Sequence, residues 1–210
     1  MIIGIPVYQR VDLLDVAGPY EMLNWMNDPK KIVDVFLISA DGKPVTTRDG
    51  LCFYAHKSFA DVPKLDIVWV PGGDPAALSE LMSGPDRTYL DYLRRVAGKA
   101  RYVCSVCEGA MLLAAAGLLD GYQATTHWAF KQCLARFPKI EVADGNPRYV
   151  LDRNRLTGGG ISSGLDETLA LIELLWGTQA AQRVQVSTQY FPRPPVAAPL
   201  PATPDCPFSW

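Results

Sequence analysis

The sequence predicts an α/β domain built on a mostly parallel sheet that is covered by helices on both faces. Short runs rich in valine and isoleucine alternate with segments of helical period, as they do in chains of strand–helix–strand units. Some of these runs are continuously apolar, such as Ile-Val-Trp-Val at 67–70, and parallel strands buried on both faces have this composition. The chain has 210 residues, of which 49% are hydrophobic, so one sizeable core can be buried.

Each element follows from a local pattern. The expected strands are 2–8, 33–39, 66–70, 101–106 and, from a weaker pattern, 123–126. The expected helices are 18–26, 74–82, 86–97, 108–116, 127–137, 164–176 and 178–190. Gly18-Pro19 is a typical start for the first helix, and the cap Asp74 followed by Pro75 is typical of the second. Two segments, 50–60 and 149–157, interrupt the alternation and are expected to add strands or a hairpin.

The domain is expected to span 1–195 and to be followed by a proline-rich tail at 196–210. Because proline lacks the N–H group, the chain from 191 onward can form neither a helix nor an inner strand. Tails of this composition are usually disordered, so a disordered tail is expected; an arm that lies on a partner surface is the alternative, and the apolar end Phe208-Ser209-Trp210 argues for it.

Composition excludes several classes of protein. The net charge of −2 and the pI of about 5.7 argue against a binder of nucleic acid or of a membrane surface. No apolar run is long enough to span a membrane, and the first residues lack the basic leader of a signal peptide. Five widely spaced cysteines are an odd number for a disulfide framework, so we expect free thiols in a reducing cytoplasm.

Two cysteines three residues apart, Cys104 and Cys107, raise three possibilities. A zinc site would need a second pair of ligands, and His56 and His127 lie in unrelated places. A redox pair would need both sulfurs at the start of a helix, but Cys104 lies within an expected strand and points into one face of the sheet. We therefore expect that the two sulfurs do not meet, that no metal is bound, and that Cys104 is a small buried hydrophobe.

Cys107 lies at the junction between that strand and the next helix, in the pattern Ser105-Val106-Cys107-Glu108-Gly109. This is the shape of a nucleophile elbow, in which a sharp turn exposes the nucleophile and a small residue two positions later lets the helix pass close to the strand. The helix N-terminus favours a thiolate, and its N–H groups can hold an anion. The alternative is a buried structural cysteine.

Two loops that follow expected strands meet the same edge of the sheet as Cys107. In the first loop, Asp15 has apolar neighbours; it is either a helix cap or a general acid/base with a raised pKa, whereas Asp12 is expected to be solvated. In the second loop, Gly72 and Gly73 allow backbone N–H groups to turn inward, although a plain tight turn capped by Asp74 also fits.

Two further features are candidates for the wall of the same pocket. The glycine cluster at 157–164 lacks the lysine and the spacing of a phosphate-binding loop, and we expect Gly159, Gly160 and Ile161 to line the pocket instead. His127, next to Trp128, is the second candidate; a structural role and a role as base both fit it.

Together these residues resemble the ThiJ/PfpI superfamily, which has the class I glutamine-amidotransferase-like fold. The similarity covers most of the chain and, within the superfamily, is strongest to the isonitrile hydratases. Amidotransferase-like regulators share much of the pattern but continue into a helix-turn-helix domain, for which this chain is expected to have no room. The motifs that carry the resemblance are Leu14-Asp15-Val16-Ala17-Gly18-Pro19, Val70-Pro71-Gly72-Gly73, the Cys107 elbow, Ala116-Gly117-Leu118-Leu119-Asp120-Gly121, Ala124-Thr125-Thr126-His127-Trp128, Arg155-Leu156-Thr157-Gly158-Gly159-Gly160-Ile161 and Ala181-Gln182-Arg183-Val184-Gln185.

The resemblance implies a flavodoxin-like three-layer sandwich that forms a homodimer, binds a small-molecule substrate and needs neither a metal nor an organic cofactor. It implies hydration of isocyanides to N-substituted formamides through a covalent thioimidate. Cys107 is the implied nucleophile and Asp15 its general acid/base. The backbone at Gly72, Gly73 and Glu108 is the implied anion pocket.

Glu108 departs from the family pattern, in which a threonine usually follows the nucleophile. If its carboxylate faces the pocket, it raises the pKa of the thiol; if it points outward, it favours the helix dipole. The substrate is therefore open. Two other functions fit the same scaffold: a glyoxalase- or deglycase-like action on reactive carbonyls, and a non-enzymatic redox or ligand sensor.

Overall fold

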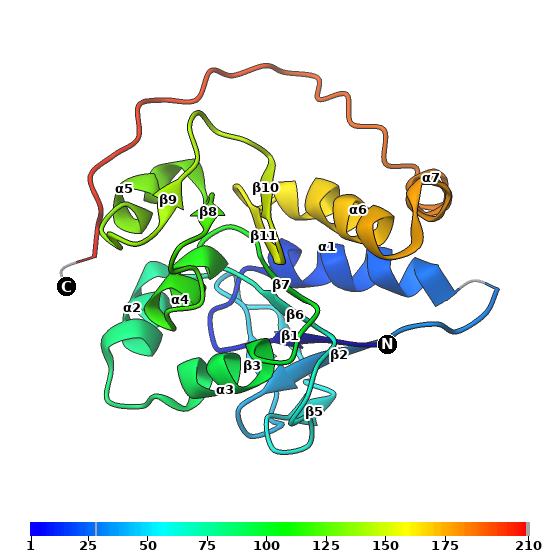
Figure 1. Ribbon diagram of the computed structural model, residues 1–210, viewed down its shortest axis with the longest axis horizontal. Helices are drawn as coiled ribbons and strands as arrows, with labels where there is room; N and C mark the ends of the chain where they lie inside the picture. Colours follow the sequence, from blue (N-terminus) through cyan, green and yellow to red (C-terminus); the bar gives the residue numbers. More distant parts are fainter. Residues whose placement is uncertain (28, 209–210) are drawn as a thin grey trace.

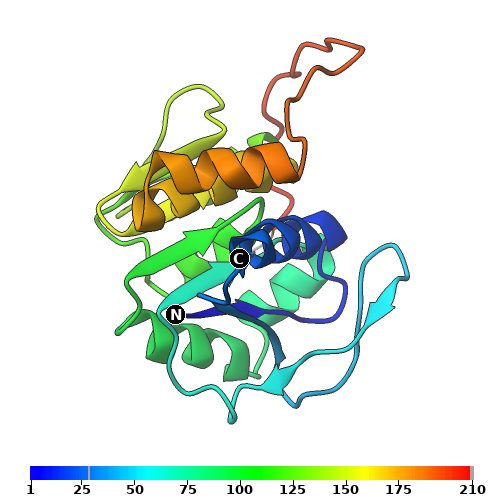
Figure 2. The ribbon, with the colours of Figure 1, turned by 90° about the vertical axis from the view of Figure 1, so that its right-hand side faces the viewer.

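The described part of the chain forms three layers, with a sheet between two layers of helices (Figures 1 and 2). The structure is a computed structural model that describes residues 1–27 and 29–208. Asp28 lies outside the described residues, as do Ser209 and Trp210 of the expected tail. Within the described residues no helix is both long and apolar enough to cross a membrane.

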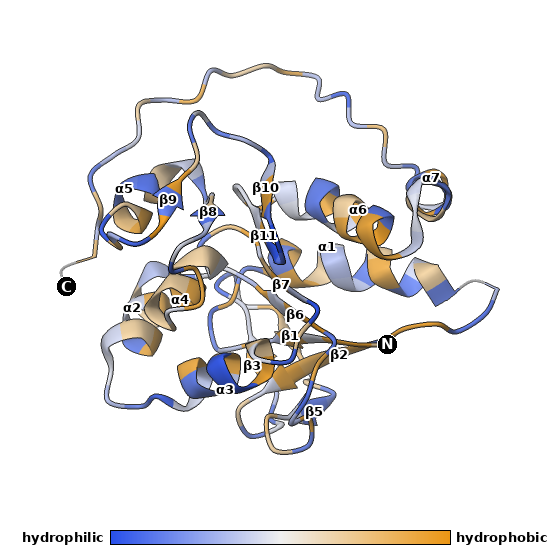
Figure 3. Cartoon of the chain, viewed as in Figure 1, coloured by the Kyte–Doolittle hydropathy of each residue, from blue (hydrophilic) through white to orange (hydrophobic). Residues whose placement is uncertain are grey.

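The central sheet has seven strands in the order β10-β11-β7-β6-β1-β2-β5. Neighbouring strands run parallel, except that β10 and β11 form an antiparallel hairpin at one edge. This confirms the mostly parallel α/β class. Figure 3 shows that β2 is largely hydrophobic. The strands are β1 (Ile2–Pro6), β2 (Asp34–Ser39), β5 (Lys57–Ser58), β6 (Ile67–Val70), β7 (Tyr102–Ser105), β10 (Tyr149–Asp152) and β11 (Arg155–Gly158).

Helices cover both faces of the sheet because its inner strands are apolar on both sides. One layer contains α1 (Leu13–Asn24), α6 (Ser163–Trp176) and α7 (Thr178–Ser187), which pack on one another. The other contains α2 (Pro75–Ser83), α3 (Thr88–Ala97), α4 (Gly109–Ala115) and the short α5 (Lys131–Leu134). The remaining elements are the 3-10 helices η1 (Trp25–Asn27) and η2 (Trp128–Phe130), and the small strand pairs β3 (Val45–Thr46) with β4 (Cys52–Phe53) and β8 (Gln123–Ala124) with β9 (Glu141–Val142).

Three expectations about the elements need correction. The first helix begins at Leu13, so Pro19 lies inside α1 and does not start it. The helix expected at 127–137 is divided into η2 and α5, since the His127 side chain accepts the Ala129 N–H and starts a separate turn. The strand expected at 123–126 pairs with β9 outside the central sheet, which the local pattern could not reveal. The segments at 50–60 and 149–157 do add strands.

The expectation that all five cysteines are free is wrong. Cys133 and Cys206 form a disulfide across 73 residues of sequence, while Cys52, Cys104 and Cys107 are free. The disulfide joins the end of the proline-rich tail to α5, so the tail is attached to the domain. Such a link between distant segments leaves no spacing signal in the sequence.

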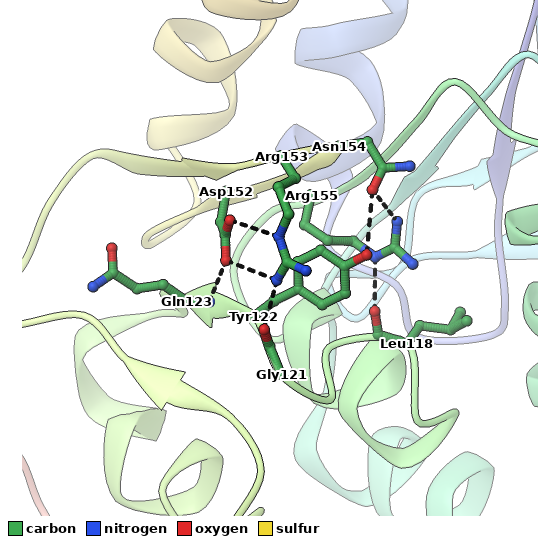
Figure 4. Close-up of polar contacts among 8 residues, drawn as sticks. All are labelled: Leu118, Gly121, Tyr122, Gln123, Asp152, Arg153, Asn154 and Arg155. Carbon is green, nitrogen blue, oxygen red and sulfur yellow. Dashed lines mark hydrogen bonds and ion pairs between the residues drawn. The ribbon is translucent and has the colours of Figure 1, made fainter.

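Tyr122 fastens the β10–β11 hairpin to the segment that precedes β8 (Figure 4). Arg153 and Arg155 place their guanidinium carbons 3.7 Å and 4.6 Å from the centre of its ring. The two arginines also donate hydrogen bonds to the carbonyl oxygens of Gly121 and Leu118. These contacts hold the sheet edge that carries the loop at 158–163 next to Cys107.

The parallel strands β1 and β6 are neighbours, and the order in which strands are added to the sheet changes direction between them. From β1 the chain crosses one face through α1 to β2, and from β6 it crosses the other face through α2 and α3 to β7. The loops at the carboxyl ends of β1 and β6 therefore separate and leave a crevice, the usual place for a ligand in an open α/β sheet. Gly72 lies in the loop after β6, and Asp15 lies in the first turn of α1, directly after the loop that follows β1.

Candidate active site

Cys107 lies on a strained turn between β7 and α4. Its φ angle is +56°, a left-handed conformation that is uncommon for a residue with a side chain. Its N–H donates to the carbonyl oxygen of Gly159 at 2.8 Å, and the Thr126 hydroxyl donates to its carbonyl oxygen at 2.8 Å. A Cβ atom on Gly109 would lie 2.0 Å from the carbonyl oxygen of Val70. The geometry is that of a nucleophile elbow, with glycine required where the helix passes the strand.

Cys104 and Cys107 have different surroundings, as the alternation of side chains along β7 predicts. Both are buried free thiols. Burial and the nearby Glu167 raise the pKa of Cys104, whereas burial, Asp15 and Glu108 raise the pKa of Cys107. The two thiols are free here, and the expectation that they form no redox pair stays a prediction.

Asp15 is completely buried in the first turn of α1. Its Oδ2 atom accepts the Gly72 N–H at 2.8 Å, which fixes the carboxyl against the loop after β6. Its backbone carbonyl would bond to the N–H of residue 19 in a regular helix, but Pro19 has none. The indole Nε1 of Trp69 donates to this carbonyl at 3.1 Å instead. A buried strand residue thus makes a proline acceptable inside α1 and anchors the turn that holds Asp15.

Replacing Trp69 by phenylalanine is expected to lower the free energy of unfolding by about 1–3 kcal/mol, because the buried Asp15 carbonyl loses its donor. Adding Pro19→Ala restores an N–H at the correct helical position. The double variant should therefore be more stable than Trp69→Phe alone, and urea unfolding of both single variants and the double variant measures the difference. Strictly additive effects would contradict the compensation.

Four acidic or thiol groups cluster beside the elbow. One ligand atom each of Asp12, Asp15 and Cys107 lie within 4.8 Å of one another, and all three residues are buried. Asp12 was expected to be solvated, but only 4% of it is exposed because the β3–β4 hairpin brings Arg48 over it, with Nη1 3.2 Å from Oδ1. Among the residues that the structure describes, none forms a hydrogen bond with Asp12 Oδ2, Asp15 Oδ1 or Glu108 Oε2.

Glu108 turns its side chain inward. It is 5% exposed, and its carboxyl accepts a hydrogen bond from the Cys107 thiol. Burial raises the pKa of Glu108 to about 7. Burial, followed by the charges of Asp12 and Glu108, raises the pKa of Asp15 well above its ordinary value, and burial also raises that of Asp12. Asp15 therefore favours its protonated form, and Glu108 exchanges its proton near neutral pH.

The thiol of Cys107 does not benefit from the helix N-terminus as expected. Burial raises its pKa well above the ordinary value, and the charges of Asp15 and Glu108 raise it further. The N–H of Ile161, which donates to the sulfur, only partly opposes these effects. The resting group is a thiol, and forming a thiolate requires a proton transfer within the cluster.

The two glycines after β6 permit close contact between the loops. A Cβ on Gly72 would lie 2.7 Å from the Glu108 backbone nitrogen, and one on Gly73 would lie 2.7 Å from the Arg10 carbonyl oxygen. Gly73 pairs with Val11 in an isolated bridge. The Gly72 N–H group already donates a hydrogen bond to Asp15, so it is not free to bind a ligand in this structure.

A cavity of about 400 Å³ lies above the elbow. Thr126 and Ile161, which both hydrogen-bond to Cys107, are in its wall, so the buried sulfur lies beneath the cavity floor. His127 is in the wall as well, and burial lowers its pKa, which favours the neutral ring. The lining residues are Leu14, Thr126, His127, Trp128, Asn146, Pro147, Arg148, Gly159, Gly160, Ile161, Ser162, Ser163 and Leu200.

The donor set could in principle contact a cation, but its chemistry suits proton transfer better. Asp12 and Asp15 offer hard oxygen atoms and Cys107 a soft sulfur. A metal ligand must be deprotonated, whereas burial raises the pKa of all three groups and so opposes their deprotonation. The arrangement is therefore a thiol among proton donors.

Some residues at this site carried no clear local signal. Trp69 and Arg48 reach it from elements distant in sequence, and Leu200 comes from the tail. Thr126 lies in the Thr-Thr-His-Trp motif, so attention to its hydroxyl would have found it.

Comparisons with known proteins agree on one family. The sequence pattern of the DJ-1/PfpI family matches residues 2–174. A protein from Pseudomonas putida named isonitrile hydratase is 43% identical over 96% of this chain and 83% of its own length. A THiJ/PfpI family protein from Pseudomonas syringae has a solved structure that covers 93% of this chain and 77% of its own, with a TM-score of 0.84 and 32% identity. The HTH-type transcriptional regulator GbdR of Pseudomonas aeruginosa is 31% identical to this chain, and the match covers 81% of this chain and 45% of the regulator.

Proposed function

Since this chain belongs to the DJ-1/PfpI family, we propose that it is an enzyme that hydrates isocyanides to N-substituted formamides, with Cys107 as nucleophile and Asp15 as general acid/base. The observation that carries the proposal is a buried thiol in contact with carboxyls of raised pKa, beneath a cavity open to a small molecule. The 43% identity to the isonitrile hydratase supports the choice of substrate.

The shape of the site fits an isocyanide. The –N≡C group is linear and narrow, and its approach to a sulfur that has no exposed surface requires the cavity floor to open. The larger substituent on nitrogen would remain in the cavity of about 400 Å³. The walls near Leu14, Trp128 and Ile161 are apolar and suit a hydrocarbon substituent.

In the first step, sulfur bonds to the isocyanide carbon. The thiol proton of Cys107 passes to the Glu108 carboxylate along their hydrogen bond, and the protonated Asp15 gives a proton to the same carbon. The thiol has then added across carbon, which gives a covalent thioimidate and leaves Asp15 ionised.

In the second step, water adds to the thioimidate carbon. Asp15 takes a proton from the water as oxygen bonds to carbon, and then protonates the nitrogen. The hydroxyl proton passes to the Asp15 carboxylate as the carbonyl forms, the carbon–sulfur bond breaks, and sulfur regains its proton from Glu108. The sum is isocyanide plus water giving formamide. Because the thiol and the two carboxyls account for every bond and proton of this cycle, we propose that neither a metal nor an organic cofactor takes part.

The proposal predicts that the wild-type protein converts cyclohexyl isocyanide to N-cyclohexylformamide. The product can be measured by chromatography against an authentic standard, with heat-denatured protein as the control. A folded protein that leaves cyclohexyl and aryl isocyanides unchanged would contradict the proposed function.

The alternative of a redox sensor is less well supported. A sensor cysteine needs an accessible thiolate of low pKa. Cys107 has no exposed surface, and its surroundings raise its pKa.

We also propose that the enzyme acts as a homodimer without nucleic acid, in line with the net charge of −2. Sedimentation would test the oligomeric state. A cytoplasmic location stays a prediction, but the cysteines no longer support it, because the Cys133–Cys206 disulfide is typical of oxidising compartments.

A further inference from the structure

The chain after α7 forms an arc whose far end is fixed to the domain. Figure 1 shows the arc in orange and red, passing from α7 to the neighbourhood of α5, and Figure 2 shows that its middle stands away from the body. Within the described residues, the backbone of 192–205 makes no hydrogen bond to the domain. The path of the arc therefore depends on where its two ends are attached and on how stiff the segment is. Seven prolines between 191 and 207 make the segment stiff.

Three contacts hold the far end. The disulfide joins Cys206 to Cys133 on α5. Phe208 is 5% exposed and places its ring 5.6 Å from that of Phe130, and its carbonyl oxygen accepts a hydrogen bond from Arg136 Nη1 at 2.8 Å. Phe130 belongs to η2, which follows His127 of the cavity wall, so the anchor lies close to the cavity in the fold.

Leu200 connects the arc to the site. It lines the same cavity as Ile161 and His127, although 54% of it is exposed. It lies between Pro199 and Pro201, and a residue before proline is restricted to extended conformations. Its side chain is therefore presented by a stiff segment.

We propose that residues 191–208 form a strap that closes the outer side of the substrate cavity, and that Leu200 limits the size of the isocyanide substituent that reaches Cys107. That the substrate is an isocyanide rests on the proposed function. The steric role of the strap does not depend on that function. The disulfide keeps the arc near the cavity by raising its effective concentration there, as any tether does. Without the disulfide, the ring contact and hydrogen bond of Phe208 remain as anchors, and the strap spends less time closed.

The first test measures access to Cys107 without any substrate. All variants carry Cys52→Ser, which removes the exposed thiol, and peptide mass spectrometry follows the labelling of Cys107. The probes are iodoacetamide, which is small, and N-(1-pyrenyl)maleimide, which is bulky. Leu200→Ala and the pair Cys133→Ser/Cys206→Ser should each raise the ratio of bulky to small labelling rates by about tenfold, which is about 1.4 kcal/mol in activation free energy.

Val196→Ala is the matched control, because Val196 lies on the same arc, is 74% exposed and does not line the cavity. It should leave the ratio unchanged. An unchanged ratio in Leu200→Ala, or an equal rise in Val196→Ala, would overturn the strap. Leu200 is largely exposed, so its substitution keeps the test valid even if the disulfide variant fails to fold.

The second test uses turnover. If the strap limits substrate size, Leu200→Ala should raise kcat/KM for naphthyl isocyanide relative to isopropyl isocyanide by a similar factor, with Val196→Ala as control. If the wild type turns over neither compound, the proposed function fails while the labelling experiment still decides the strap. Turnover with unchanged size preference would overturn the role of Leu200 and leave the proposed function standing.

Discussion

Cys107→Ser is expected to lower isocyanide hydration by at least about a thousandfold, because a hydroxyl of much higher pKa replaces the thiol at the elbow. Serine fits the same turn, so the fold should be preserved. Cys104→Ala is the matched control: it changes the other cysteine of the pair, whose sulfur has a different environment, and should retain activity. The measurement is the initial rate of formamide formation by each variant, with circular dichroism to confirm folding.

Asp15→Asn separates a chemical role of this residue from a structural one. The amide oxygen can still accept the Gly72 N–H, but the side chain can no longer give or take a proton, so hydration should fall by about 10²–10⁴-fold. In the resting site the raised pKa of Asp15 keeps its carboxyl protonated, so the substitution removes no charge and alkylation of Cys107 by iodoacetamide should stay nearly unchanged. If Asp15 had only a structural role, the rate of hydration and the rate of Cys107 alkylation would change together. That outcome would contradict the proposed acid/base role.

The elbow and its glycine were predictable because their cause is local. A strand that ends in Cys107, followed by a helix that must pass the strand at Gly109, specifies the turn within a few residues. The structure agrees, with a positive φ at Cys107 and no room for a Cβ on Gly109. The parallel sheet was predictable for the same reason, since apolar runs such as 67–70 are local patterns.

The start of α1 was not predictable from the local sequence. Gly18-Pro19 has the pattern of a helix start, and only the indole of Trp69, more than 50 residues away in the chain, makes Pro19 acceptable inside a helix. The burial of Asp12 likewise depends on Arg48 from the β3–β4 hairpin. Both errors concern contacts between distant segments, which spacing and composition do not record.

The ionisation of Cys107 was wrongly predicted for an energetic reason. A helix N-terminus contributes about 0.3–1 kcal/mol to an anion at an exposed site. Complete burial costs a thiolate more than this, and two carboxyls beside it add repulsion when they ionise. A sequence motif identifies the position of a nucleophile more securely than its protonation state.

Glu108→Gln is expected to make the protein more stable at high pH. The pKa of Glu108 is about 7 in the folded protein against an ordinary value of 4.5, so between these values the folded state binds more protons than the unfolded state. Stability from this group is therefore complete below pH 4.5 and is lost as pH rises to about 7, a change of roughly 3 kcal/mol. Glutamine does not ionise, so urea unfolding should give similar values for wild type and variant at pH 4 and a more stable variant at pH 8.

The same substitution should also make Cys107 more reactive at pH 8. There the ionised Glu108 opposes the thiolate and accepts the thiol hydrogen bond, and both effects raise the pKa of Cys107. Removing the charge should raise the rate of alkylation by iodoacetamide about tenfold, the effect of lowering a thiol pKa by about one unit. Glu80→Gln, an exposed acid on α2, is the control and should change neither stability nor labelling. If Glu108→Gln leaves both quantities unchanged between pH 4 and pH 8, Glu108 does not ionise beside the thiol, and the first proton transfer must use Asp15 or Asp12.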